Sequence, residues 1–198
     1  MTAGRLAVLA ALALLAPASA EAHIGIEGMD GFSAGMLHPV LAPHHLMVLV
    51  GLGLRSGQRG VADMTATMTG LVAGLAIGGL AAWWFALDAP PFLAAVALAV
   101  LFGAATVADA PSARLPALLS GLAAGGLVNI AQVFHSTISG DGWPAIAGAA
   151  LATLLVVFNI AFLASLATRP VAKIAVRVAA SWLTAIALLM AGLLLTGG

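Results

Sequence analysis

The chain has 198 residues, of which 63% are hydrophobic and only 7% are charged. Soluble domains carry about 25% charged and about 45–50% apolar residues, so this composition excludes a soluble globular domain and also a disordered chain. Seven basic and seven acidic residues give no net charge, which leaves no basic face for nucleic acid. With no cysteine, the chain has no disulfide, no thiolate nucleophile and no cysteine metal site.

The first 22 residues predict a cleavable secretory signal peptide, and residues 23–198 predict a single transmembrane domain. Arg5 supplies the positive start, and Leu6–Ala16 form the short apolar run. Residues 18–20 (Ala-Ser-Ala) and 20–22 (Ala-Glu-Ala) both fit the small-residue cleavage pattern, so either cleavage position stays open. An uncleaved first helix is the alternative interpretation.

Six apolar stretches follow, separated by short loops rich in Gly, Pro, Ser and Asp. One membrane span needs about 20 apolar residues, so each stretch is a candidate span. The expected spans are Gly35–Leu54, Met64–Leu87, Pro91–Ala108, Leu115–Ile138, Trp143–Ala167 and Val171–Thr196. The predicted fold class is therefore all-α: a polytopic membrane protein with a six-helix transmembrane bundle after the signal peptide.

The charge pattern predicts the orientation of these spans. A cleaved signal peptide places the mature N-terminus outside the cytoplasm. With six spans, all seven Lys and Arg then fall on the cytoplasmic side, as the positive-inside rule requires. Trp83, Trp84 and Trp143 fall at the outer interface, where an aromatic belt is expected. We therefore expect both termini of the mature chain to lie on the outer side.

Two stripes of small residues recur at every fourth position of the second and fourth spans. Small residues at this spacing let helix backbones approach closely, which predicts either a tight bundle or an oligomer seam. A chain so rich in Gly and Ala also produces such stripes by chance. The stripes are Gly70, Gly74 and Gly78, and Ala117, Gly121 and Gly125.

The histidines are the sharpest feature of the sequence, because the predicted orientation places all of them on the outer side. They are His23, His38, His44, His45 and His135. Coordinating residues inside a membrane are costly and by default mark a site or a pathway. Neutral imidazole suits nickel, cobalt, copper and zinc, so we predict a metal or proton role. Interfacial histidines in a re-entrant loop are the alternative.

Two prolines interrupt the segment that carries three of these histidines. On a continuous helix His38 and His45 would share a face but would be separated by about 10 Å of rise, too far for one ion. Pro39 and Pro43 remove backbone donors and kink or break a helix. A broken helix would allow the two imidazoles to fold toward one centre.

Other polar residues accompany the histidines. Asn129, Gln132 and His135 step by three along the fourth span, and Asn159 lies at mid-depth in the fifth. We expect Asn129, Gln132 and Asn159 to line a permeation path, with helix–helix hydrogen bonding as the alternative.

Further candidate ligands lie near the start of the mature chain. If His23 is the mature N-terminus, its α-amine and imidazole form a chelate for a divalent ion. Met29, Met36 and Met47 are either soft ligands that favour Cu(I) or ordinary membrane filler.

The segments His23–Gly25 and Gly31–Gly35, followed by His38-Pro39, resemble the HupE/UreJ family. These small bacterial membrane proteins are regarded as secondary permeases for nickel or cobalt and are associated with hydrogenase and urease maturation. The family pattern is His-Pro, two residues, then Gly-Leu-Asp-His, and His38, Pro39 and His45 match it in register. The Asp is replaced by His44. Of a second, His-rich family signature, only His135 remains, because Thr137 and Ser139 replace the later histidines.

The resemblance implies a secondary permease of the bacterial inner membrane that imports a divalent transition metal, nickel or cobalt, from periplasm to cytoplasm.

No nucleophile elbow, P-loop or zinc-protease motif is present, so we expect no enzyme activity. We expect no permanent cofactor, since the ion is the substrate. The expected partners are the lipid bilayer, the metal ion and a homo-oligomer or complex partner on the Gly stripes. The alternatives are a copper-handling variant and a non-transporting structural or assembly subunit.

Overall fold

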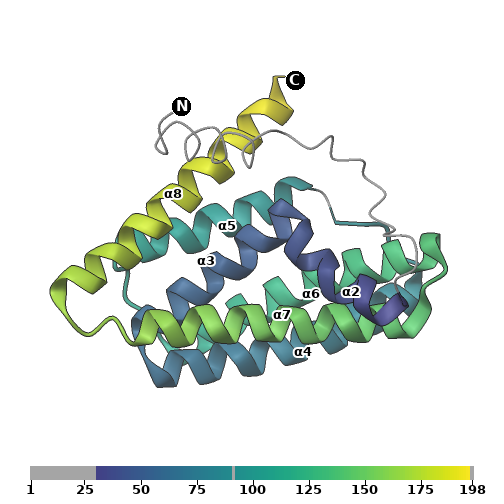
Figure 1. Ribbon diagram of the computed structural model, residues 1–198, viewed down its shortest axis with the longest axis horizontal. Coiled ribbons are helices and arrows are strands. Elements are labelled where there is room, and N and C mark those ends of the chain that lie inside the picture. The colour runs from purple at the N-terminus through teal and green to yellow at the C-terminus, as the bar shows by residue number, and fades with distance from the viewer. Residues whose placement is uncertain (1–29, 91, 197–198) are drawn as a thin grey trace, which may run out of the picture.

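The computed structural model describes residues 30–90 and 92–196, and its regular structure is entirely α-helical (Figure 1). The predicted signal peptide, His23 and Met29 lie outside the described residues. The helices are α2 (Gly31–Leu41), α3 (Pro43–Arg59), α4 (Val61–Phe85), α5 (Phe92–Val107), α6 (Arg114–Ser139), α7 (Gly142–Ser165) and α8 (Pro170–Leu195). The all-α prediction is confirmed.

Length and apolar composition identify the helices that can cross a membrane. α4, α6, α7 and α8 each qualify alone, and α2 and α3 qualify together as a pair bent by 73°. α5 is apolar but has only 16 residues. The described helices therefore support a multi-pass membrane protein with four spans, or five with the bent pair. The predicted third span, Pro91–Ala108, corresponds to α5 and stays a prediction.

The first predicted span, Gly35–Leu54, is two helices that meet at a sharp bend (Figure 1). Ala42 has extended backbone angles (φ −83°, ψ 104°), because the residue before a proline is disfavoured in the α conformation. Pro43 is the first residue of α3, where a missing N–H leaves no helical bond unmade. The predicted break is thus confirmed at Pro43, whereas Pro39 lies inside α2.

α2 starts level with the beginning of α7. The Asp30 carboxylate caps α2 by accepting a hydrogen bond from the Ser33 N–H (2.7 Å), and this bond lowers the pKa of the Asp30 carboxyl below its usual value. Gly31 packs so tightly on the backbone of Asp141 that a Cβ there would have no room. His38, seven residues further along α2, therefore lies roughly 10 Å below this end of the bundle.

α3 occupies the centre of the bundle and runs parallel to α5. At one end the ring of His44 lies 4.8 Å from the ring of Phe92, the first residue of α5. At the other end Gln58 donates from Nε2 to the carbonyl oxygen of Thr106 (3.1 Å). α5 therefore covers nearly the full length of α3.

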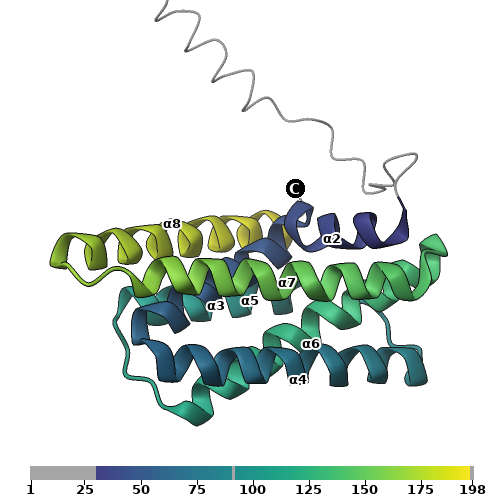
Figure 2. The same ribbon diagram turned by 60° about the horizontal axis from the view of Figure 1, so that its bottom comes forward.

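α4 and α6 pack as a parallel pair through the two predicted stripes of small residues. A Cβ on Gly70 or Gly74 would overlap the carbonyl oxygen of Leu118 or Leu122, and one on Gly121 would overlap the carbonyl oxygen of Thr67. Figure 2 shows α6 crossing α4 along this contact. The stripes form a seam inside the chain, so the structure gives no support to their predicted use as an oligomer or docking face.

Basic and aromatic side chains gather at opposite ends of the bundle. At one end Arg59 and Arg177 both pair with the carboxylate of Asp109 (2.9 and 2.8 Å). α4 begins beside this cluster and ends near Trp83, whose ring lies 4.7 Å from that of Trp143 at the start of α7. This separation agrees with the predicted placement of basic residues on one side and aromatic residues on the other. We call the basic end the inner end and the tryptophan end the outer end.

The close approach of α4 and α6 predicts contrasting effects of two Gly→Ala substitutions. Gly70→Ala should lower the free energy of unfolding by about 1–3 kcal/mol, because the added methyl group must push the two helices apart. Gly192→Ala in α8, where a Cβ meets open space, should leave it unchanged or raise it by up to about 1 kcal/mol. Unfolding in detergent, followed by circular dichroism, compares the two. Equal changes in the free energy of unfolding for the two variants would contradict the close contact of α4 and α6.

Candidate functional site

Four of the five histidines form one cluster where α2, α3 and α6 meet. Ring centres are 4.7 Å apart for His38 and His135, 5.6 Å for His38 and His45, and 4.2 Å for His44 and His45. The break at Pro43 makes this possible, because it removes the separation that a continuous helix would impose between His38 and His45. We call His38, His44, His45 and His135 the histidine cluster.

The spacing within the histidine cluster suits pairs of ligands rather than a complete ligand set. Two imidazoles that share a tetrahedral ion have ring centres roughly 5 Å apart, given metal–nitrogen bonds of about 2.0–2.1 Å. His38 has that spacing to both His135 and His45. In the described part of the chain, however, no group of three or more His, Asp or Glu side chains is arranged to hold a metal ion. A third ligand for one ion would require the rings to rearrange.

Burial makes two ring nitrogens of this cluster available as ligands. His38 Nε2 and His45 Nδ1 are buried and have no hydrogen-bond partner among residues 30–90 and 92–196, and the side chain of His45 is only 2% exposed. A buried polar atom left without a partner costs about 1–3 kcal/mol. A bound transition metal would satisfy both nitrogens, since a neutral imidazole offers one lone pair for coordination.

The other two histidines connect the cluster to its surroundings. The side chain of His135 is exposed, four residues before the end of α6, so an ion can reach it from the outer end. His44 is half-buried between the rings of His45 and Phe92. The contact with Phe92 was not predicted from the sequence, because it depends on how α3 and α5 are aligned.

Two of the predicted path residues lie below the histidine cluster on α6. Gln132, one turn before His135, is buried, and its Oε1 has no hydrogen-bond partner within the described part of the chain. Asn129 donates from Nδ2 to the carbonyl oxygen of Leu75 on α4 (2.6 Å), while its Oδ1 is buried and unpartnered. Asn129 thus forms the helix–helix hydrogen bond given as the alternative, and it still offers an acceptor to the interior.

Asn159 is not brought together with these residues. It lies on the exposed face of α7 and donates from Nδ2 to the carbonyl oxygen of Leu155 in its own helix (2.7 Å). Met47 packs against the apolar core, as expected of membrane filler, whereas the ligand role of Met36 stays a prediction. The polar residues near the histidines that face the interior are therefore those of α6.

A scan against protein families matches residues 10–194 to the family described as HupE / UreJ protein. The chain belongs to the HupE/UreJ family. Searches of curated proteins and of solved structures find no match. The match confirms the resemblance based on the His38-Pro39 segment and extends it over nearly the whole chain. HupE/UreJ proteins form a transporter-like membrane family rather than an enzyme family, and membership associates this chain with nickel or cobalt transport.

The convergence of α2 and α6 in this HupE/UreJ protein can be tested with cysteine pairs, because the chain has no cysteine of its own. His38→Cys with His135→Cys should react efficiently with a short thiol-specific cross-linker, since the two rings are in contact. A protease site in the loop at residues 86–90 makes the cross-link visible, because the fragments then stay joined.

The matched control is His38→Cys with Asn159→Cys, since Asn159 lies on the opposite, exposed face of α7. This pair should remain uncross-linked under the same conditions. Equal yields for the two pairs would contradict the histidine cluster.

Proposed function

We propose that this chain is a secondary permease of the bacterial inner membrane that imports a divalent transition metal ion, nickel or cobalt, from periplasm to cytoplasm. The observation that carries the proposal is the pair of buried, unpartnered imidazole nitrogens, His38 Nε2 and His45 Nδ1, at the break between α2 and α3. Such groups are costly inside a membrane unless they serve a ligand. Family membership supports nickel or cobalt as that ligand.

The proposed protein has six spans, with the bent pair α2–α3 as the first and α5 as the third. α5 is short, with a rise of about 24 Å for its 16 residues. Its support as a span comes from its neighbours, because it extends alongside α3 from His44 near the outer end to Gln58 near the inner end. Six spans place both ends of the mature chain in the periplasm.

The basic residues support the direction of transport. Arg59 and Arg177, which share Asp109, lie at the inner end, and the positive-inside rule assigns that end to the cytoplasm. The histidine cluster then faces the periplasm, with exposed His135 as the first contact. In this scheme the ion passes from His135 to the buried pair His38 and His45, with Gln132 beneath. His23, outside the described residues, is a further proposed ligand for capture at the surface.

We propose that the membrane potential drives import. A doubly charged ion gains about 4.6 kcal/mol per 100 mV on moving inward, twice the value for a single charge. The membrane potential is therefore sufficient to drive import. The two alternatives gain no specific support. The Gly stripes that a subunit would use for docking face each other inside the chain, and Met47 packs against the apolar core.

Metal titration of the purified protein tests the proposal. Calorimetry in detergent with nickel, cobalt, copper and zinc should show saturable binding that His38→Ala and His45→Ala each weaken by about tenfold or more, since each removes a ligand. Asn159→Ala, a polar residue of α7 on the exposed face, should bind as the wild type does.

Uptake of the tightest-binding ion, measured in cells that lack their own importers, should be lost with the same two variants. If the wild type binds the ion no more tightly than a variant with both His38→Ala and His45→Ala, these histidines form no metal site. Binding without uptake would favour the non-transporting subunit.

A further inference from the structure

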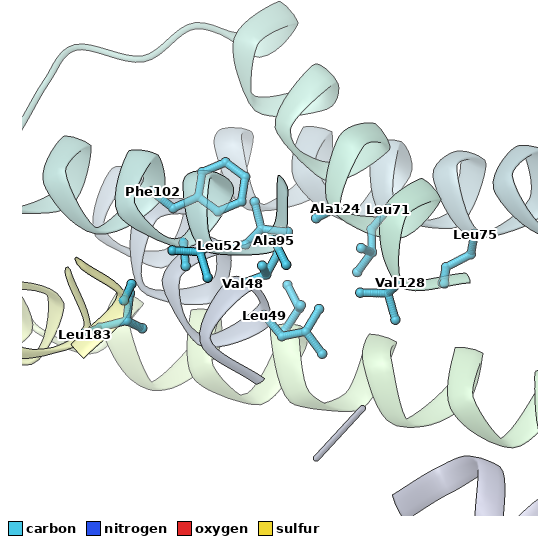
Figure 3. Packing of buried hydrophobic residues seen from close by; sticks show 14 residues of the cluster. Val48, Leu49, Leu52, Leu71, Leu75, Ala95, Phe102, Ala124, Val128 and Leu183 are labelled. Atoms are coloured by element: carbon cyan, nitrogen blue, oxygen red, sulfur yellow. The ribbon is translucent and has the colours of Figure 1, made fainter. Parts of the chain in front are cut away.

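An apolar layer separates the histidine cluster from the inner end of the bundle. Directly after His45, α3 contributes Val48, Leu49 and Leu52, which are almost completely buried. Figure 3 shows them together with Leu71 of α4 and further apolar side chains of α4, α5 and α6. An ion held by the histidines therefore faces a dry barrier, and a polar environment is needed on its inner side if the ion is to leave.

A cavity of about 170 Å³ lies on the inner side of this layer. It is larger than the roughly 10–15 Å³ of accessible volume that one water needs, so it can hold an ion with part of its hydration shell. Leu52 and Phe102 line it from the apolar layer. Three helices contribute polar side chains to its lining: Ser56 of α3, Asp63 and Thr67 of α4, and Ser120 of α6, while Ser112 adds one from the loop between α5 and α6. We call this space the inner cavity.

Two of these polar groups, the Asp63 carboxylate and the Thr67 hydroxyl, have no other partner in the described structure. The ion pairs there are those of Asp109 with Arg59 and Arg177, so the Asp63 carboxylate has no basic partner within 4.0 Å among the described residues. Thr67 is only 2% exposed. Its neighbours Thr65 and Thr69 each donate to the carbonyl four residues earlier (2.9 Å). Thr67 forms no such bond in the described chain and lines the inner cavity instead.

Arg55 borders the same cavity and is held by the loop between α5 and α6. Its guanidinium donates to the carbonyl oxygens of Ala105 (3.4 Å), Ala110 (2.5 Å) and Pro111 (3.2 Å). These contacts are with neutral carbonyls, and the carboxylates of Asp63 and Asp109 act on the guanidinium only from beyond 4.0 Å. The positive charge of Arg55 is therefore only partly compensated beside the cavity. That charge opposes tight retention of a cation, and a transport path requires binding weak enough for the ion to leave.

We propose that the inner cavity is a second cation site, on the cytoplasmic side of the apolar layer. Asp63 receives the partly hydrated divalent ion with one carboxylate, and the hydroxyls of Thr67 and Ser120 supplement its water ligands. Oxygen ligands of this kind, supplemented by water, hold a divalent ion loosely compared with an all-protein cage. The charge of Arg55 then favours release to the cytoplasm. The inference rests on the proposed function, since it requires an ion that crosses the layer.

Asp63→Asn tests this assignment, with Asp88→Asn as the matched control, because Asp88 is an exposed carboxylate after the outer end of α4. Asp63→Asn should leave nickel or cobalt binding at the histidine cluster within about twofold of wild type and lower the initial uptake rate by about tenfold. Asp88→Asn should change neither quantity. An uptake rate for Asp63→Asn equal to that of Asp88→Asn would overturn the inner site while leaving the proposed function intact.

A second pair covers the case in which Asp63→Asn does not fold. Thr67→Val keeps the side-chain shape and removes the hydroxyl, and it should lower uptake by about threefold or more with histidine binding unchanged. Thr65→Val, whose hydroxyl bonds within its own helix, should have no effect. Unchanged uptake in Thr67→Val would overturn the assignment. A wild type without histidine-dependent uptake would overturn the proposed function itself, and the inner site with it.

Discussion

Pro43 prevents residues 31–59 from forming one continuous helix, and the histidine cluster depends on this constraint. The residue before a proline avoids the α conformation, so Ala42 is extended and α2 turns away from α3 by 73°. Inside a membrane, freed backbone groups and irregular backbone are tolerated where they lie within the protein or line a cavity. Here the break lies beside the imidazoles of His38 and His45, so one local feature both interrupts the span and assembles the site.

The remaining packing isolates this site from the inner end. α4 and α6 meet along glycine, which allows the buried face of α6 to carry Asn129 and Gln132 toward the interior without separating the helices. Below them, apolar side chains of α3, α4 and α6 close the path, and polar groups reappear at Ser56 and Thr67. If the chain transports an ion as proposed, polar sites on both sides of a dry layer correspond to a closed path.

Much of this arrangement could be predicted from the apolar stretches and the prolines of the sequence. Apolar length gave the helices to within a few residues, and proline at position 43 gave the break that unites His38 and His45. Helix rotation was not predictable: Asn159 faces outward, although composition alone made it as good an interior residue as Asn129. The glycine stripes predicted close packing but not which helix they meet. The inner cavity could not be predicted, because Asp63 and Ser120 are far apart in the sequence and are brought together only by the packing of α4 on α6.

The central claim is that imidazoles gathered by the break bind the transported ion, and X-ray absorption at the metal edge tests it most directly. Nickel- or cobalt-loaded protein should show the multiple scattering of at least two imidazoles at metal–nitrogen distances of about 2.0–2.1 Å. That signal should fall when His38 and His45 are both replaced by alanine. A first shell of oxygen alone, unchanged by these substitutions, would contradict the account.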